Sequence, residues 1–376
     1  MGNGNLDQKC VNVIRGLVMD TVRAANSGHP GGAMSSADFA YVLFSEFLNT
    51  DPDDARWFNR DRFVLSAGHE SALLYALLQL TGRIGMDDLR AFRQLGSLTP
   101  GHPERDLTPG VEATTGPLGQ GFAMGVGMAA AEKHLAGRLN RPGQTIVDHY
   151  TYAIVSDGDL MEGVASEAAS LAGTLGLGKL IYLYDDNKIS IEGGTDLAFT
   201  EDVGGRFEAY GWQVLRVDEG DQVEAIMTAI DAARAETARP SLVMVRTHIG
   251  CGSPKQDSAA AHGEPLGAEG AQATRDCFGW PSDPFHVPPE VLAHLRQARE
   301  RGRQAEDQWQ QALAAYLQAN PEDGRQYAAW LKGQLPQGWR EALPVFDPAD
   351  KPVATRSASG QVINALAPVV QNLLGG

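Results

Sequence analysis

Two short polar motifs stand directly after apolar runs of the sequence. Asp157 follows the run at residues 152–155, and Asn187, 30 positions after Asp157, follows the run at 180–184. One predicted helix lies between the runs, as in a βαβ unit, whose two strands end at the same edge of a sheet. With the backbone carbonyl of Ile189, these side chains would offer Mg²⁺ the oxygen ligands it prefers, and Gly158 would let a phosphate approach the backbone. Either motif alone is typical of an ordinary turn, but the paired spacing favours a metal and phosphate site.

Four histidines form a second set of candidates, because each has a glycine directly before or after it. They occur in SGHPGG, SAGHES, TPGHPE and AAHGEP, as His29, His69, His102 and His262. A fifth, His248 in RTHIG, lacks such a neighbour. A neutral imidazole both gives and accepts protons near neutral pH, and glycine neighbours let the ring approach a ligand. The set therefore predicts a site where protons are moved.

The elements that must position these residues alternate along the chain. Apolar runs predict strands at residues 63–65, 152–155, 180–184, 214–217 and 242–245, and helical patterns lie at 72–80, 163–175 and 223–233. A glycine-rich turn at 114–121 opens a helix of small residues. This order predicts a doubly wound α/β fold, with a mostly parallel sheet and helices on both faces. In such folds ligands bind beyond the carboxyl ends of the strands, where the candidate residues fall.

The last hundred residues differ in composition. Residues 288–317 predict a charged amphipathic helix, residues 333–352 hold four prolines and predict a linker, and residues 356–374 predict one more helix. The four prolines make a continuous helix through 333–352 unfavourable.

Composition and charge narrow the class of protein. The chain has 376 residues, of which 43% are hydrophobic and 21% charged, as in ordinary globular domains. No apolar run is long enough for a membrane span, and no secretory signal is recognisable, so we expect a cytoplasmic protein without a membrane partner. The three cysteines form no CxxC pair and are expected to be reduced. A net charge of −16 argues against nucleic-acid binding.

Nine motifs occur in the order and approximate spacing of bacterial transketolases. They are SGHPGG, FVLSAGHESALLY, LTPGHPE, TTGPLGQG, SDGDLMEG, YDDNKISIEGGT, FEAYGW, GCGSP and AHGEPLG. From about residue 6 to residue 376, the chain thus resembles the thiamine-diphosphate-binding half of a transketolase. The resemblance implies two cofactors, thiamine diphosphate and Mg²⁺ or another divalent cation such as Ca²⁺. It also implies transfer of a two-carbon ketol unit from xylulose 5-phosphate or a similar ketose phosphate to an aldose phosphate such as ribose 5-phosphate, in the pentose phosphate pathway.

The resemblance further implies roles for single residues. The metal ligands would be Asp157, Asn187 and Ile189. The cofactor contacts would be His69, Gly116, Leu118, Gly158, Asn187 and His262. The catalytic groups would be His29, His102 and His262, and the sugar phosphate would contact His29, His262 and Arg356. The planar, permanently charged fork of arginine suits a substrate phosphate.

A domain organisation and partners also follow from the resemblance. Residues 1–332 would form the cofactor-binding domain with a helical extension, 333–352 a linker, and 353–376 the start of a pyrimidine-binding domain. In the family, that second domain supplies the glutamate that activates the cofactor, so no residue of this chain is assigned to that role. We therefore expect a homodimer, a second polypeptide that supplies the pyrimidine-binding and C-terminal domains, or both, and little sugar transfer by the chain alone.

Three alternatives remain open from the sequence. A dinucleotide site is disfavoured, because Met124 stands where the third glycine of that fingerprint belongs. Dihydroxyacetone synthase and deoxyxylulose-phosphate synthase share the metal motif, and the histidine set favours transketolase over them. The third alternative is a cofactor-binding subunit or inactive fragment.

Some residues depart from the family pattern. The family's thiamine-diphosphate signature starts with Gly-Asp-Gly, and Ser156 stands here in place of its first glycine. The other departures are Glu70, Lys188 and the pair Ser35 and Ser36. These last four are expected to touch no proposed ligand, although they could retune substrate preference.

Overall fold

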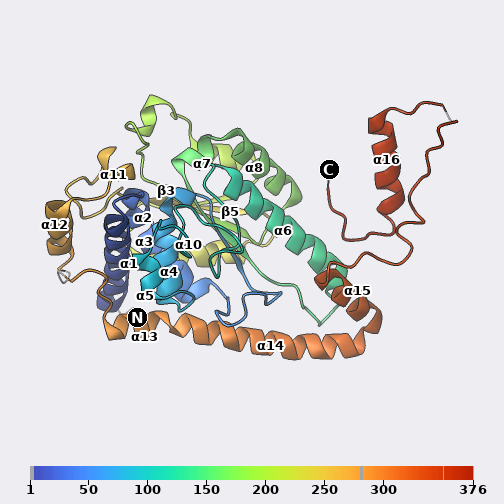
Figure 1. Cartoon of the computed structure of the whole chain (residues 1–376), viewed down its shortest axis with the longest axis horizontal. Coiled ribbons are helices and arrows are strands. Elements are labelled where there is room, and N and C mark those ends of the chain that lie inside the picture. The colour runs from blue at the N-terminus through green and yellow to red at the C-terminus, as the bar shows by residue number, and fades with distance from the viewer. Residues whose placement is uncertain (1–3, 280–282, 350, 376) are drawn as a thin grey trace. The chain divides into compact units, whose positions relative to one another are not determined.

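A sheet of five parallel strands lies at the centre of the computed structural model, which describes residues 4–279, 283–349 and 351–375 (Figure 1). The strands are β1 (Arg62–Leu65), β2 (Thr151–Ser156), β3 (Leu180–Asp186), β4 (Gln213–Val217) and β5 (Ser241–Arg246). Their order in the sheet is β1-β2-β3-β5-β4, and every pairing is parallel. Each strand overlaps one predicted from an apolar run, so the predicted α/β fold is confirmed.

Helices cover both faces of the sheet. On one face are α1 (Gly4–Ala25), α2 (Pro30–Ser35), α3 (Ala37–Val42), α4 (Ser71–Leu80) and α10 (Val223–Ala235). On the other are α6 (Gln120–Leu139), α7 (Asp157–Met161), α8 (Gly163–Leu175) and α9 (Val203–Ala209). Alternation along β2 shows why two layers form: Tyr152 and Ile154 pack into the first core, whereas Ala153 and Val155 pack into the second. Successive side chains of a strand point to opposite faces, so a strand that is apolar throughout needs cover on both.

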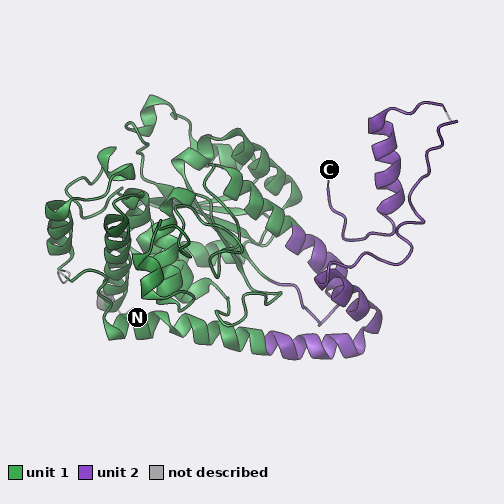
Figure 2. Cartoon of the chain, viewed as in Figure 1, with its two compact units in different colours: residues 1–130, 149–307 green, residues 131–148, 308–376 purple. Residues whose placement is uncertain are grey.

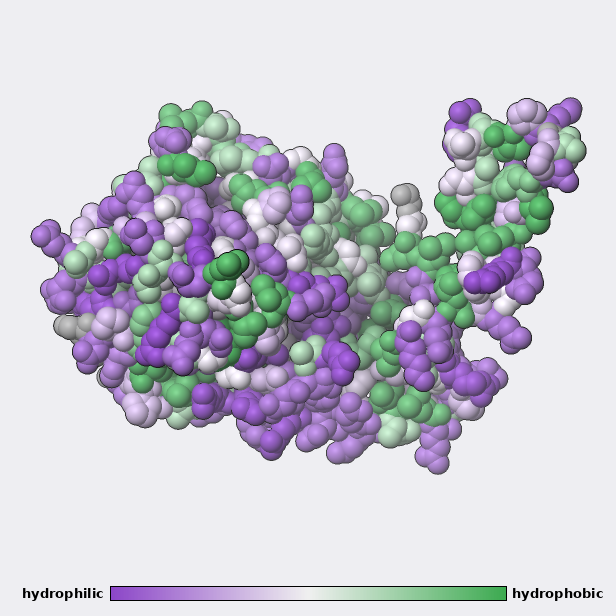
Figure 3. All heavy atoms as spheres, viewed as in Figure 1, coloured by the Kyte–Doolittle hydropathy of each residue, from purple (hydrophilic) through white to green (hydrophobic). Residues whose placement is uncertain are grey.

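The remaining elements are short or lie late in the chain. They are η1 (Leu43–Phe47), η2 (Gly68–Glu70), α5 (Met86–Arg90), η3 (Thr195–Leu197), α11 (Ala260–Gly263), α12 (Ala268–Phe278), α13 (Pro289–Leu295), α14 (Gln297–Ala319), α15 (Pro321–Leu331) and α16 (Thr355–Leu366). The lower edge of Figure 3, where Figure 1 places α14, is mainly hydrophilic, in keeping with the charged sequence of that helix. None of the described helices has the length and apolar character needed to cross a membrane.

Two predicted helices differ from the observed ones. The helix predicted at residues 288–317 consists of α13 and α14, which are separated at Arg296. The helix predicted at 356–374 ends at Leu366. Its end has a local cause, because Pro368, two positions after Leu366, has no N–H to donate and so cannot continue the hydrogen bonds of the helix.

The chain divides into two compact units (Figure 2). Residues 1–130 and 149–307 form the first, which holds the sheet, and residues 131–148 and 308–376 form the second. Within the second unit, the Trp309 indole donates to the Ile146 carbonyl at 2.8 Å, and the Tyr316 hydroxyl donates to the Leu139 carbonyl at 2.6 Å. The predicted domain boundary at residues 332–333 stays a prediction. Residues 1–3, 280–282, 350 and 376, some of which fall in the predicted domains, lie outside the described residues.

Close packing of α8 gives a stability prediction. A Cβ added at Gly173 would lie 1.7 Å from the Tyr210 carbonyl oxygen, an overlap that only backbone movement could relieve. We expect Gly173→Ala to lower the free energy of unfolding by about 3 kcal/mol, the upper end of the range for overpacked sites. Urea denaturation measures this change. Gly163→Ala on the same helix is the matched control, because nothing lies within 4 Å of its added Cβ. A Gly173→Ala variant as stable as this control would contradict the prediction.

Candidate functional site

The loops after three neighbouring strands open into one cavity of about 410 Å³. β1 is followed by His69 and Glu70, β2 by Asp157 and Gly158, and β3 by Asn187, and all of these residues line it. Its remaining lining residues come from loops, short helices and the last position of β2: His29, Gly32, His102, Gly116, Leu118, Ser156, Met161, Ile189, Ser190, Ile191, Glu192, Ile249 and His262. The cavity therefore contains every candidate site residue from the sequence except Arg356.

Asp157 and Asn187 offer oxygen ligands at one part of this cavity. The Tyr184 hydroxyl donates to Oδ1 of Asp157, while Oδ2 of Asp157 is buried and accepts no hydrogen bond from the described residues. Burial raises the pKa of Asp157 to about 7, and the hydrogen bond from Tyr184 opposes the rise. A buried carboxylate oxygen without a donor is costly unless a cation satisfies it. The oxygen donors present fit a hard divalent cation.

The amide of Asn187 is held in one orientation by its neighbours. Its Nδ2 donates to Oδ2 of Asp185 at 2.7 Å, and its Oδ1 accepts from the Ile189 N–H at 2.9 Å. An amide oxygen has a second lone pair, which stays open to a cation. Among residues 4–279, 283–349 and 351–375, no group of three His, Cys, Asp or Glu side chains could hold a metal. A metal at this site would therefore need the mixed set of carboxylate, amide and carbonyl oxygens.

Sequence reasoning missed the polar network beneath the cavity. Asp185 accepts hydrogen bonds from Ser35 Oγ at 2.9 Å, from the Thr247 hydroxyl and from Asn187, and so it orients a proposed metal ligand. Ser36 Oγ donates to the buried Glu70 at 3.0 Å, and Glu70 lines the cavity. The departures at residues 35, 36 and 70 thus belong to the site or its support.

The four predicted histidines form a single cluster. The His29 ring lies 5.3 Å from His69, 5.6 Å from His262 and 6.5 Å from His102, measured between ring centroids, and His69 stacks on His262 at 5.2 Å. Burial, assisted by the other histidines, lowers the pKa of His29 to about 4 and that of His69 to about 3. Burial also lowers the pKa of His102 and of His262. All four are therefore neutral at pH 7 and able both to donate and to accept a hydrogen bond.

A side chain at position 116 would strain the backbone and crowd the ring of His102. The φ of Gly116, +143°, lies in a region that side chains rarely adopt, and an added Cβ would lie 3.1 Å from the ring of His102. Gly158 is also close-packed, because its added Cβ would lie 3.0 Å from Leu118 Cδ1. Backbone at both positions can thus approach a ligand that fills the cavity.

The other residues that the sequence singled out lie elsewhere. His248 does not line this cavity, and its Nδ1 lies 2.9 Å from an Asp257 carboxylate oxygen. Arg356 is exposed in the first turn of α16, in the second unit. Its role toward a substrate phosphate stays a prediction.

The neutral histidine cluster predicts sensitivity to acid. Because the folded state depresses the pKa of His29 from 6.5 to about 4, its contribution to stability is complete above about pH 6.5 and is lost as the pH falls toward 4. We expect His29→Gln to reduce the acid-induced loss in unfolding free energy by on the order of 1 kcal/mol, after allowance for partial solvent exposure. Urea denaturation at several pH values measures this loss. His248→Gln is the control, and an unchanged pH profile for His29→Gln would refute the prediction.

Comparison with known proteins agrees with this geometry. A family model described as the thiamine diphosphate binding domain of transketolase matches residues 6–336. The transketolase of Geobacillus stearothermophilus is 54% identical over 99% of this chain and 56% of its own length. Chloroplastic transketolase-1 of Arabidopsis thaliana is 50% identical over 100% of this chain and 51% of its own length.

Solved structures show the same similarity in three dimensions. A transketolase from Pichia stipitis, in complex with sedoheptulose 7-phosphate, matches with a TM-score of 0.93 at 47% identity, over 97% of this chain and 54% of that one. Transketolase from Leishmania mexicana matches with a TM-score of 0.93 at 45% identity, over 97% of this chain and 55% of that one. This chain thus spans about half the length of these relatives. It belongs to the transketolase family and corresponds to that family's N-terminal, thiamine-diphosphate-binding domain.

Proposed function

We propose that this chain is the cofactor-binding half of an enzyme that transfers a two-carbon ketol unit between sugar phosphates. The observation that carries the proposal is the cavity itself, where four neutral histidines face the oxygen ligands of Asp157 and Asn187. A metal-held diphosphate and a set of uncharged proton carriers are the two requirements of that chemistry.

Each site residue that the resemblance implied has a defined task in this proposal. Asp157, Asn187 and the Ile189 carbonyl bind Mg²⁺, and Gly158, His69 and His262 contact the diphosphate. The backbones of Gly116 and Leu118 contact the rings of the cofactor. When bound, thiamine diphosphate supplies the nucleophilic carbon that the reaction requires. His29, His102 and His262 hold and move hydroxyl protons of the sugar, a task for which neutral imidazoles are suited. Arg356 binds the substrate phosphate.

We propose xylulose 5-phosphate as a donor and ribose 5-phosphate as an acceptor, as in the pentose phosphate pathway. Structures of the Pichia stipitis relative include complexes with sedoheptulose 7-phosphate and with xylulose 5-phosphate. Dihydroxyacetone synthase is the competing activity within the same cofactor class, and a comparison of acceptor aldehydes distinguishes the two.

The partner in this proposal is a second copy of the chain, a further polypeptide segment, or both. Relatives are about twice as long as the matched region, and we propose that their remaining part corresponds to the pyrimidine-binding and C-terminal domains. Here residues 1–332 serve as the cofactor-binding domain, 333–352 as a linker and 353–376 as the start of the pyrimidine-binding domain. Without the other domains, we expect weak cofactor binding and little or no transfer.

Two measurements test the proposal. Calorimetric titration with thiamine diphosphate is expected to show binding with Mg²⁺ or Ca²⁺ and none with EDTA. A coupled assay with xylulose 5-phosphate and ribose 5-phosphate is expected to show turnover only when a polypeptide with the pyrimidine-binding and C-terminal domains is added. Absence of metal-dependent cofactor binding would refute the proposed site, and robust turnover by the chain alone would refute the need for those domains.

A further inference from the structure

A second cavity, of about 490 Å³, lies in the first unit and shares no lining residue with the histidine cavity. Segments before and within β1, the end of α4, the loop at 105–112 and the start of α14 enclose it. Its size lies within the range of small-molecule sites, roughly 300–1,000 Å³. Nothing in the proposed transfer reaction uses this cavity.

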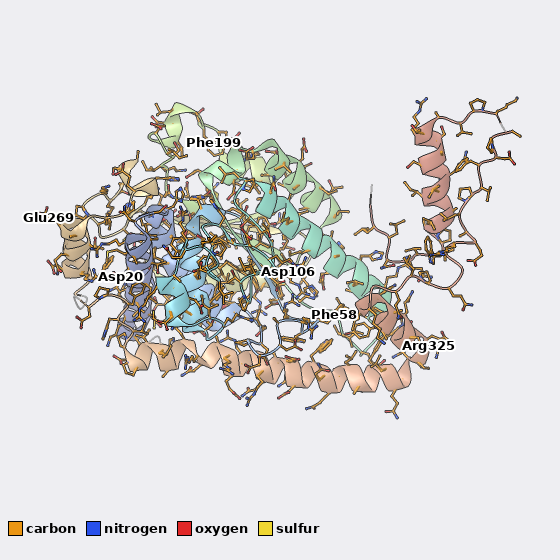
Figure 4. The ribbon with its side chains drawn as sticks, in the orientation of Figure 1. Asp20, Phe58, Asp106, Phe199, Glu269 and Arg325 are labelled. Carbon is orange, nitrogen blue, oxygen red and sulfur yellow. The ribbon has the colours of Figure 1, made fainter. Side chains whose placement is uncertain are left out.

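Arginine dominates the charge of this cavity. Five arginines line it, against two carboxylates, Asp106 and Glu112, of which Asp106 is labelled in Figure 4. The arginines are Arg56, Arg60, Arg83, Arg105 and Arg299. The whole chain carries a net charge of −16, so the cavity is a local reversal of sign. Such a pocket attracts anions in spite of the overall charge.

Two of the five arginines are already neutralised. Arg60 makes two hydrogen bonds of 2.7 Å to the carboxylate of Glu112, and Arg299 makes two of 2.7 Å to that of Asp53. Arg105 is exposed and lies 3.9 Å from the Asp106 carboxylate, too far for a direct hydrogen bond. Three arginines, at positions 56, 83 and 105, are therefore left without a hydrogen-bonded carboxylate, and Asp106 offsets one of their three charges.

Arg83 is the most constrained of these three. It is half-buried, and burial lowers its pKa. The Arg60 charge adds to this effect, whereas the carboxylates of Glu112, Asp51 and Asp53 oppose it. Within the described part of the chain, no acceptor or carboxylate lies within bonding distance of its guanidinium. Gly110, at φ +92°, makes room for it, because an added Cβ would lie 2.5 Å from Arg83 Cδ. A partly desolvated guanidinium without an acceptor in the protein can gain charge-assisted hydrogen bonds from a bound anion.

Apolar side chains line the cavity together with the arginines. Phe44, Leu48, Phe63, Leu78 and Val111 line it, and the Phe44 and Phe63 rings meet edge to face at 4.9 Å between centroids. A cavity lined by both apolar side chains and N–H donors suits a ligand with one charged end and one flat or apolar end. The planar fork of arginine matches phosphate oxygens in pairs.

We propose that this cavity is a binding site for an organic phosphate with an aromatic or apolar body, whose phosphate is held by Arg83 together with Arg56 and Arg105. Such a site is separate from the cofactor cavity and independent of the proposed transfer activity.

Binding of two probes tests this proposal. ADP carries a diphosphate on a flat base, and inorganic pyrophosphate carries the charge alone. Each is titrated calorimetrically into the chain in the presence of saturating thiamine diphosphate and Mg²⁺. The variants are Arg83→Met, Arg83→Lys and Arg56→Met, and Asp157→Ala reports on the other cavity. Arg303→Met is the matched control, because it removes an exposed arginine of α14 that pairs with Glu300.

The expected pattern is specific to Arg83. Arg83→Met weakens ADP binding roughly tenfold or more, as the loss of charge-assisted hydrogen bonds implies. Arg83→Lys and Arg56→Met give smaller losses, whereas Arg303→Met and Asp157→Ala bind as the unchanged chain does. ADP binds more tightly than pyrophosphate. The proposal is overturned if neither probe binds at millimolar concentration, or if Asp157→Ala abolishes ADP binding while the Arg83 and Arg56 variants retain it. If Arg83→Met does not fold, full ADP binding by Arg83→Lys and Arg56→Met also overturns it.

Discussion

Asp157→Ala is expected to abolish Mg²⁺-dependent binding of thiamine diphosphate. The substitution removes the only carboxylate in the proposed ligand set, and its Oδ2 is buried without a hydrogen-bond donor among the described residues. Loss of a group that merely supports a metal ligand costs roughly 10–100-fold in affinity, so loss of the ligand itself should cost more. Calorimetric titration with the cofactor, at fixed Mg²⁺, measures the change.

The same variant should fold normally. In the absence of metal, we expect its thermal midpoint to equal or exceed that of the unchanged chain, because a buried carboxylate with a raised pKa is unfavourable in the folded state. Asp231→Asn, on the exposed side of α10, controls for the loss of one negative charge. Unaltered cofactor affinity in Asp157→Ala would remove this residue from the metal site. A large fall in its thermal midpoint would mean that Asp157 is structural.

Asp38→Ala should cause one of the largest losses of stability, about 3–5 kcal/mol in the free energy of unfolding. Asp38 on α3 forms an ion pair with Arg15 on α1, and both side chains are at most 5% exposed. Arg15 also donates to the Met34 carbonyl of α2 at 3.2 Å, so its side chain links α1 to both α2 and α3. Removal of the carboxylate leaves a buried guanidinium charge uncompensated. Since α2 begins directly after His29, the histidine cluster should loosen as well.

The size of this loss depends on burial, which a surface pair can test. Arg90 and Asp87 form an ion pair of 2.8 Å on α5, with side-chain exposures of 54% and 95%, and we expect Asp87→Ala to cost less than about 1 kcal/mol. Burial raises the pKa of Asp38 from 3.8 to about 6, against the opposing charge of Arg15, so the ionised carboxylate of the ion pair predominates only above about pH 6. Urea denaturation of both variants is therefore compared at neutral pH. Equal losses would show that burial does not decide the cost.

Local sequence patterns determined most of the fold. The five apolar runs became the five strands. A short continuous apolar run bounded by turns suits a strand buried on both faces, as in β2 and β3, whereas the edge strand β4 is only partly buried. The pairing of Asp157 with Asn187 also followed from sequence, since the βαβ connection places both at the same edge of the sheet. Glycine neighbours marked the four histidines that meet in one cavity. Sequence patterns predicted helix ends less well: the last helix was predicted to run to residue 374, but α16 ends at Leu366.

Tertiary structure alone decided which distant side chains support the site. Ser35 reaches Asp185 across 150 positions of sequence, and Ser36 reaches Glu70, and no local pattern indicates either hydrogen bond. The sequence also does not indicate that the guanidinium of Arg83 is unpaired, because this depends on how the loop at 105–112 and the start of α14 pack around the same cavity. Strand periodicity and turn residues act over a few neighbouring positions, so a sequence displays them directly. Burial and charge pairing arise from packing between elements, which is why the structure was needed to show that the four histidines are neutral.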